Sequence, residues 1–172
     1  GFTNVITVDE QMIVDGNFPT VIYPNPEEAE ALTLALAKAA EVDADIVMAT
    51  DPDADRVGLA IKDDAGQFIL LNGNQALCLL VDYVLSAWES AGKLNGDQYV
   101  VKTIVTSYMI DAIAASKNVE CLNVLTGFKY IGEIMTQRQG KKTFVVGGEE
   151  SYGYLVGEHA RDKDAVVACC MF

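Results

Sequence analysis

The sequence has few basic residues, a single histidine and no pair of cysteines at metal-binding spacing. Its 172 residues contain 12 lysines and arginines against 25 aspartates and glutamates, a formal net charge of −13 at pH 7. A chain this acidic is repelled by a nucleic-acid backbone and by an anionic membrane, which argues against both as partners. A phosphorylated metabolite stays possible, because a bound metal and a few basic side chains can reverse the field at one site.

The cysteine pattern and the lack of a long apolar run bear on metal binding and on cellular location. The four cysteines, Cys78, Cys121, Cys169 and Cys170, include no CxxC pair, so zinc is disfavoured. Adjacent Cys169 and Cys170 are poorly placed for a mutual disulfide. No signal-peptide pattern opens the chain, and no apolar run approaches the roughly 20 residues that span a membrane. We therefore expect reduced cysteines and a cytoplasmic protein.

What is present is an ordinary globular composition, 51% hydrophobic and 22% charged, with strand-like and helix-like segments in alternation. This alternation predicts an α/β fold with right-handed βαβ units and a mostly parallel sheet. Strands are expected at 5–8, 45–49, 57–61, 68–71, 99–105, 119–125 and 143–146, and helices at 27–41, 75–90, 106–116, 130–139 and from 165 onward.

Local signals place the helix starts, the turns and a domain boundary. Asn25 with Pro26 is expected to start the first long helix, and Asn74 to cap the second. Residues 63–66 read Asp-Asp-Ala-Gly, a hairpin signature. The pattern changes around 71–74, which predicts two domains, 1–71 and 72–172. Because apolar segments stand at both ends, we also expect a piece of a longer protein.

The most informative stretch is Asp51-Pro52-Asp53-Ala54-Asp55-Arg56, which follows the predicted strand at 45–49. Carboxylates at every second position can turn to one side and converge on one hard cation. Three clustered carboxylates need a counter-charge, and Mg²⁺ is the natural one. The neighbouring Arg56 suggests that the ion shares its site with an anionic oxygen, most plausibly phosphate.

Two other interpretations fit the acidic residues of this loop less fully. Aspartate and proline are common turn formers, so the stretch can also be a solvated loop. An EF-hand also begins with alternating aspartates, but Arg56 stands where its turn requires glycine and Lys62 where it requires glutamate. The EF-hand is excluded, and the solvated loop stays open.

Loops after three later strands are further candidates, because ligands of parallel sheets bind at the carboxyl ends of the strands. The segment Thr126-Gly127-Phe128-Lys129 offers an ammonium for a phosphate or a proton, although a lone lysine is usually a surface residue. Residues 147–153 combine glycines, carboxylates and hydroxyls, which suits a polyol or simply a turn. Thr106-Ser107-Tyr108 is best explained as a helix cap.

A dense charge cluster follows at 158–164. His159 could titrate there near neutral pH, but a histidine among charges is more often solvated. Arg161 and Lys163 can serve only to neutralise Asp162 and Asp164.

Taken together, the acidic loop, the segment 126–129 and the segment Gly148-Glu149-Glu150-Ser151-Tyr152-Gly153 closely resemble the α-D-phosphohexomutase family of phosphoglucomutases and phosphomannomutases. The resemblance covers the whole chain, as most of the second and third domains of that family. It implies two consecutive three-layer α/β/α domains with mixed sheets. Both would be incomplete, lacking the first strand and helix of one and the end of the other.

The resemblance also assigns roles to residues. It implies Mg²⁺ binding by Asp51, Asp53 and Asp55. It places Arg56 beside the active-site phosphate and makes Lys129 a candidate acid or base. Substrate contacts would come from Glu149 and Ser151, which grip the sugar hydroxyls, and from Thr126 and Gly127.

One departure concerns the substrate. The common family form has glycine where Pro52 and Ala54 stand, and the form seen here resembles the phosphoglucomutase-2 and phosphopentomutase branch. Glucose, mannose and pentose phosphates therefore stay open as substrates.

The implied reaction is a phosphoryl shuttle between a phosphoserine and a sugar phosphate through a bisphosphate. The serine loop and the main phosphate-gripping loop of the family belong to its first and fourth domains, and neither motif occurs here. We therefore expect this chain alone to be inactive and to need those two domains as partners. A non-catalytic sugar-phosphate or metal-binding module is the alternative. A haloacid-dehalogenase-like phosphatase fits less well, because Asp55-Arg56 follows the aspartate pair.

Overall fold

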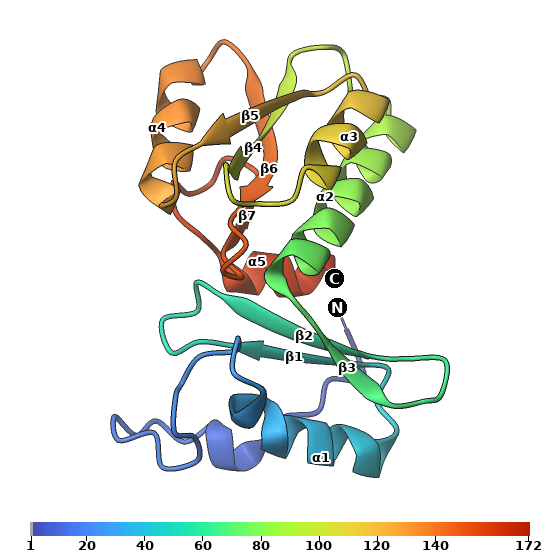
Figure 1. Cartoon of the computed structure of the whole chain (residues 1–172), viewed down its shortest axis with the longest axis vertical. Helices are drawn as coiled ribbons and strands as arrows, with labels where there is room; N and C mark the ends of the chain where they lie inside the picture. The colour runs from blue at the N-terminus through green and yellow to red at the C-terminus, as the bar shows by residue number, and fades with distance from the viewer. Residues whose placement is uncertain (1) are drawn as a thin grey trace.

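The computed structural model describes residues 2–172, which form a three-stranded and a four-stranded sheet with helices around them (Figure 1). The strands are β1 (Ile46–Thr50), β2 (Val57–Lys62), β3 (Phe68–Leu71), β4 (Gln98–Thr103), β5 (Glu120–Val124), β6 (Thr143–Gly148) and β7 (Tyr154–Val156). The α-helices are α1 (Thr33–Val42), α2 (Gly73–Ser90), α3 (Met109–Ser116), α4 (Phe128–Arg138) and α5 (Ala165–Met171), and two short 3-10 helices span Asp9–Gln11 and Ala29–Leu32. The predicted α/β class with mixed sheets is confirmed, but the sheets are not mostly parallel: β4 is parallel to β5 and β6, whereas β1-β2, β2-β3 and β6-β7 are antiparallel pairs.

The three-stranded sheet is antiparallel throughout, in the order β1-β2-β3. The predicted hairpin at 63–66 is confirmed, with Gly66 at a φ of 77°, where glycine is favoured. Parallel pairing is thus confined to the other sheet, because tight turns can join only antiparallel neighbours. Helix α1 and the 3-10 helix before it cover one face of this sheet, where Leu32 and Ala39 pack against Val47 and Ala60.

Three expectations near the amino terminus are wrong. Residues 5–8 form no strand, and Val5 and Ile6 are exposed. The helix expected from residue 27 begins as a 3-10 turn at Ala29 and becomes α-helical only at Thr33. The Asn25 side chain does not cap it, because its Oδ1 accepts the Glu27 N–H at 3.0 Å and closes a local turn instead.

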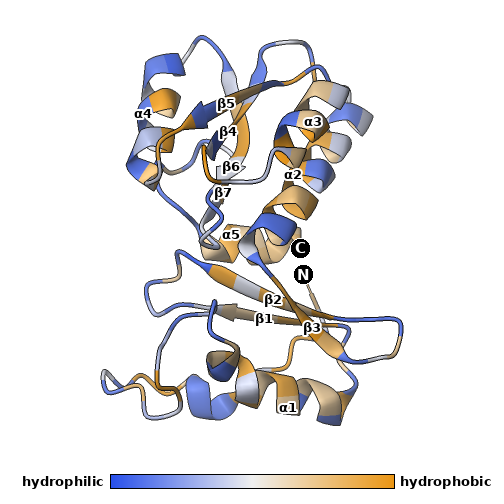
Figure 2. Ribbon diagram, viewed as in Figure 1, coloured by the Kyte–Doolittle hydropathy of each residue, from blue (hydrophilic) through white to orange (hydrophobic). Residues whose placement is uncertain are grey.

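The four-stranded sheet has the order β5-β4-β6-β7, with β4 parallel to both of its neighbours. Helices α2 and α3 cover one face and α4 the other (Figure 1), so alternate residues of β4 enter different cores. Val100 packs with the α2 and α3 side, while Tyr99 and Val101 pack with the α4 side. Figure 2 shows the apolar residues gathered on these strands and on α2. This part of the chain is a three-layer α/β/α sandwich.

Helix α2 begins two residues earlier than expected, at Gly73. A capping box holds its start: Asn72 Oδ1 accepts the Gln75 N–H, and the Gln75 side chain accepts the Asn72 N–H, both at 2.9 Å. The predicted cap, Asn74, instead accepts the Ser107 N–H at 2.7 Å and ties α2 to the loop before α3.

The second face of the three-stranded sheet rests on the rest of the molecule. Val57 and Leu59 of β2 share one hydrophobic cluster with α2 and with Ala165 and Ala168 of α5, and α5 lies between the two sheets (Figure 1). This continuous packing holds the acidic loop against residues 150–165. The boundary between 71 and 72 stays a prediction.

Two further findings concern the membrane and the cysteines. Among the described helices, none combines the length and hydropathy that crossing a bilayer requires. The four cysteines all lie within residues 2–172 and form no disulfide there.

Candidate functional site

The acidic loop forms a cluster of carboxylates between β1 and β2. One oxygen from each of Asp51, Asp53 and Asp55 lies within 4.8 Å of the other two. Strand β1 ends at Thr50 and β2 begins at Val57, so an antiparallel strand pair holds both ends of the loop. Hard carboxylate oxygens at this spacing match the preference of Mg²⁺, which usually takes a few carboxylates and completes its shell with water or phosphate.

Asp51 is the anchored member of the cluster. Its Oδ1 accepts the backbone N–H groups of Asp55 and Arg56, each at 2.9 Å. Burial raises the pKa of the Asp51 carboxyl, and the nearby charges of Asp55 and Asp53 add to that rise against the lowering effect of the two N–H groups. A raised pKa means that negative charge is disfavoured there, and a cation would relieve that.

Basic side chains surround the cluster. Arg56 pairs with Glu27 at 2.9 Å and reaches Asp51 and Asp55 only at 3.9 Å. Lys163 binds Asp55 at 3.0 Å from the segment before α5. Burial tends to lower the pKa of Lys163, but its hydrogen bonds to Asp162 and Asp55 outweigh that effect and raise it. Lys163 is therefore a cation held at the edge of the carboxylate cluster.

Ala54 is strained, with a φ of 55° in the left-handed region. We expect Ala54→Gly to stabilise the chain by about 0.5 kcal/mol, because the relief of strain exceeds the added freedom of the unfolded state. Urea unfolding measures the change. The matched control is Ala65→Gly in the exposed β2–β3 turn, where φ is not positive, and it should cost about 0.5 kcal/mol. A loss of stability in both variants would contradict the strain argument.

The loop after β6 lies directly against the acidic loop. The Val57 N–H donates to the Tyr152 carbonyl at 3.1 Å, and Arg56 forms a β-bridge with Gly153. The structure therefore brings together the residues of the first and third sequence motifs, which are far apart in the chain.

The segment 126–129 joins the same region through Glu149. The buried Glu149 carboxylate accepts the Gly127 N–H at 2.8 Å, and Gly127 has a φ of 120°. Ser151 is half-buried beside it. The Lys129 ammonium lies 5.0 Å from the centroid of the Tyr130 ring, and no contact joins it to the acidic loop in the described residues.

The charged residues at 158–164 make two kinds of contact, one at the start of α5 and one at the acidic loop. His159 pairs with Asp164 at 2.9 Å, and Asp164 caps α5 by accepting the Val167 N–H. Of the expected neutralising pairs, Lys163 with Asp162 is present at 2.9 Å, but Lys163 also reaches Asp55.

The sequence did not predict three contacts at the site, which are made by Glu27, Glu150 and Lys163. Each acts through a partner distant in the chain, so no local pattern marks it. The helix cap expected at Thr106-Ser107-Tyr108 is not formed at the N-cap of α3, because the Tyr108 side chain makes no cap hydrogen bond. Ser107 Oγ accepts the Met109 N–H at 3.2 Å instead.

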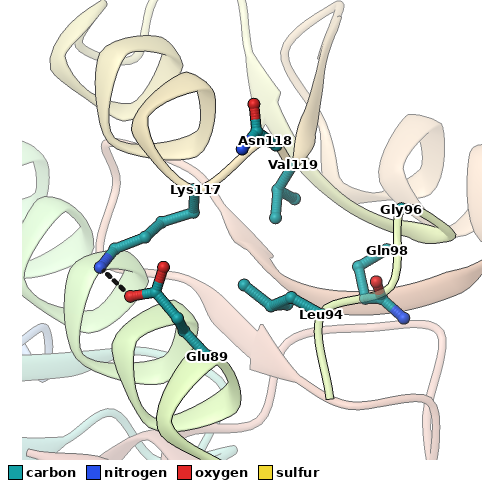
Figure 3. Close-up of a pocket in the computed structure, with 7 residues that line it drawn as sticks. All are labelled: Glu89, Leu94, Gly96, Gln98, Lys117, Asn118 and Val119. Atoms are coloured by element: carbon teal, nitrogen blue, oxygen red, sulfur yellow. Dashed lines mark hydrogen bonds and ion pairs between the residues drawn. The ribbon is translucent and has the colours of Figure 1, made fainter. Parts of the chain in front are cut away.

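A separate hollow lies at the opposite end of the four-stranded sheet (Figure 3). It is lined by Glu89, Leu94, Gly96, Gln98, Lys117, Asn118 and Val119. Gln98 begins β4, whereas the loops described above leave the carboxyl ends of the strands. Ligands of such sheets bind at the carboxyl ends, so this hollow is not the candidate site.

Two family descriptions match the chain. Residues 72–172 match "Phosphoglucomutase/phosphomannomutase, alpha/beta/alpha domain III", and residues 1–66 match the corresponding domain II. The phosphoglucomutase of Staphylococcus saprophyticus is 39% identical over 167 residues, which cover 96% of this chain and 30% of that protein. A probable phosphoribomutase of Schizosaccharomyces pombe is 38% identical over 172 residues, covering 98% and 29%.

Solved structures show the same architecture. A putative phosphomannomutase from Thermus thermophilus matches with a TM-score of 0.66 and 25% identity, over 87% of this chain and 31% of that one. A phosphoglucomutase/phosphomannomutase family protein from Burkholderia thailandensis has a TM-score of 0.70 at 23% identity, over 91% and 31%, which shows the fold alone. The chain spans about 30% of the length of the curated relatives it matches. On these matches and this fold, the chain belongs to the phosphoglucomutase/phosphomannomutase family.

Proposed function

We propose that this chain is the metal-binding and sugar-binding part of a Mg²⁺-dependent phosphosugar mutase that acts through a phosphoserine and a bisphosphate intermediate. The observation that carries the proposal is the cluster of Asp51, Asp53 and Asp55 oxygens within 4.8 Å, directly beside the loop of Glu149 and Ser151. The serine would belong to a longer protein of the length of its relatives, which we call the parent chain. This chain alone is then inactive, and the reduced cysteines suit a cytoplasmic enzyme.

The acidic loop would hold Mg²⁺ through the three aspartates. Bound there, the ion would neutralise charge on the transferring phosphoryl group. Lys163 keeps one Asp55 oxygen engaged, and the backbone N–H groups engage Asp51 Oδ1, so the remaining oxygens are the ones left for a cation. Arg56 would exchange part of its contact with Glu27 for a substrate phosphate, since a guanidinium binds either anion through the same fork.

The loop after β6 would bind the sugar. The Glu149 carboxylate is fixed by the Gly127 N–H and can accept from a sugar hydroxyl through its other oxygen. The Ser151 hydroxyl can both donate and accept. We propose Lys129 as the acid or base that exchanges a proton with the reacting hydroxyl through its ammonium, and Thr126 and Gly127 as substrate contacts in the same segment.

A phosphopentomutase is the second candidate. It is favoured by the similarity to the probable phosphoribomutase and by Pro52 and Ala54 in the acidic loop. Both candidates use the same metal and sugar loops, so the substrate distinguishes them.

The test is an assay of the parent chain with the 1-phosphates of glucose, mannose and ribose, with and without a chelator. We expect conversion of at least one of them that a chelator abolishes. Glu149→Gln and Ser151→Ala should each raise KM about tenfold. Glutamine leaves one acceptor oxygen to serve both the Gly127 N–H and a sugar hydroxyl, and alanine removes the Ser151 hydroxyl. The control is Glu133→Gln on the exposed side of α4, with unchanged kinetics. A folded parent chain that converts none of the three sugars would favour the non-catalytic module.

A further inference from the structure

Glu150 stands between the two proposed sugar-binding residues, but its side chain is held by a different part of the sheet. Its Oε2 lies 2.9 Å from Thr103 Oγ1 and 3.2 Å from Thr106 Oγ1. Thr103 ends β4, and Thr106 lies in the turn that follows. Both threonines are buried, with exposed fractions of 0% and 2%. A carboxylate from one loop is thus bound to hydroxyls of the neighbouring one.

The number of hydroxyl hydrogens in this cluster indicates which threonine donates to Glu150. Thr103 Oγ1 and Thr106 Oγ1 are themselves 2.7 Å apart, so three short contacts share only two hydroxyl hydrogens. An ionised carboxylate can only accept. The arrangement with the two shortest bonds has Thr106 donating to Thr103 and Thr103 donating to Glu150. Thr103 is therefore the direct partner, and Thr106 orients it.

The Glu150 backbone is confined as well. A Cβ placed on Gly73, the first residue of α2, would lie 1.8 Å from the Glu150 carbonyl oxygen. The Gly73 carbonyl in turn accepts the Tyr154 hydroxyl at 3.0 Å. The peptide between Glu150 and Ser151 is thus held against the start of α2, while the Glu150 side chain reaches β4.

The two adjacent glutamates therefore connect the loop after β6 to the carboxyl ends of two different strands. Glu149 binds the Gly127 N–H after β5, and Glu150 binds Thr103 at the end of β4. The sheet order β5-β4-β6 places these exits on the same side of β6. Neither threonine needs to touch a ligand for this anchoring to set where Glu149 and Ser151 point.

We propose that Glu150 is a positioning residue for sugar binding, which holds Glu149 and Ser151 in place through Thr103 and Thr106. The inference rests on the proposed function, because it names what orients the sugar loop of that site. Glu150 acts as a hydrogen-bond acceptor, so its negative charge is not what the role requires.

The test compares Glu150→Ala, Glu150→Gln and Thr103→Val in the parent chain, with Glu133→Ala as the matched control. We expect Glu150→Ala to raise KM for the sugar phosphate about tenfold with kcat nearly unchanged, because ground state and transition state lose the same orientation. Thr103→Val should act in the same direction. Glu150→Gln should stay within about twofold of the wild type, because its amide oxygen still accepts the Thr103 hydroxyl.

Amide hydrogen exchange at residues 149–153 supplies a readout that does not depend on turnover. We expect about tenfold faster exchange in Glu150→Ala and wild-type exchange in Glu150→Gln. If Glu149→Gln impairs an active parent chain while Glu150→Ala changes neither KM nor exchange, this inference is wrong and the proposed function stands. If Glu150→Gln is as impaired as Glu150→Ala, the charge itself is needed and the positioning role is also wrong. An inactive parent chain would overturn the proposed function and this inference together.

Discussion

Replacing Asp53 by asparagine in the parent chain is expected to lower mutase turnover on the order of a thousandfold while leaving the fold intact. Asp53 is the exposed member of the three-aspartate cluster, whose oxygens lie within 4.8 Å of one another. Asparagine keeps the size of the side chain but removes one of the three negative charges. The loss should therefore fall on the cation and on the reaction that needs it.

Metal binding provides the direct measurement. Calorimetry should show Mg²⁺ affinity about tenfold weaker in Asp53→Asn, and the rise in melting temperature that Mg²⁺ gives the wild type should shrink accordingly. The matched control is Asp64→Asn, the same charge change in the exposed β2–β3 turn, where Mg²⁺ affinity and turnover should not move. If Asp53→Asn keeps the wild-type Mg²⁺ affinity, the proposed metal site is wrong and the acidic loop is a solvated turn.

Local patterns in the sequence were enough to predict the parts of the site that lie on single loops. The alternation of Asp51, Asp53 and Asp55 after an apolar strand predicts converging carboxylates, and their oxygens do converge. The segment after β6 was identified by its glycines, carboxylates and hydroxyls. These features depend on the few residues that carry them, so a short stretch of sequence contains them in full.

The contacts that join loops were not predictable in this way. Lys163 reaches Asp55, and Glu27 reaches Arg56, only because α5 and the segment before α1 pack beside the acidic loop. Strand β7 was missed because it is three residues long and follows a stretch interpreted as a loop. The strand expected at 5–8 is absent although its residues are apolar. They have no partner strand among the described residues, and a strand is not stable alone.

Among the described glycines, Gly73 is expected to be the one where alanine is most damaging, with a loss of stability of about 3 kcal/mol. The added Cβ would lie 1.8 Å from the Glu150 carbonyl oxygen, 2.7 Å from its carbonyl carbon and 3.0 Å from the Tyr152 nitrogen. All three are backbone atoms, so no side-chain rotation relieves the clash. Alanine favours a helix over glycine by only about 1 kcal/mol, which is too little to compensate. The control is Gly16→Ala, whose Cβ meets no atom within 4 Å and whose stability should hardly change.

The same substitution should also impair sugar binding, and this separates a displaced loop from a general loss of stability. Leu85→Ala empties part of the core on the opposite end of α2, where Leu85 is fully buried, and should cost about 3 kcal/mol as well. At temperatures where both variants are folded, Leu85→Ala should keep the wild-type KM for sugar phosphate. Gly73→Ala should raise that KM, because Gly73, unlike Leu85, lies against the peptide between Glu150 and Ser151. Thermal unfolding and steady-state kinetics on the two variants measure both quantities. Equal KM values in the two variants would mean that the start of α2 supports the fold without shaping the sugar loop.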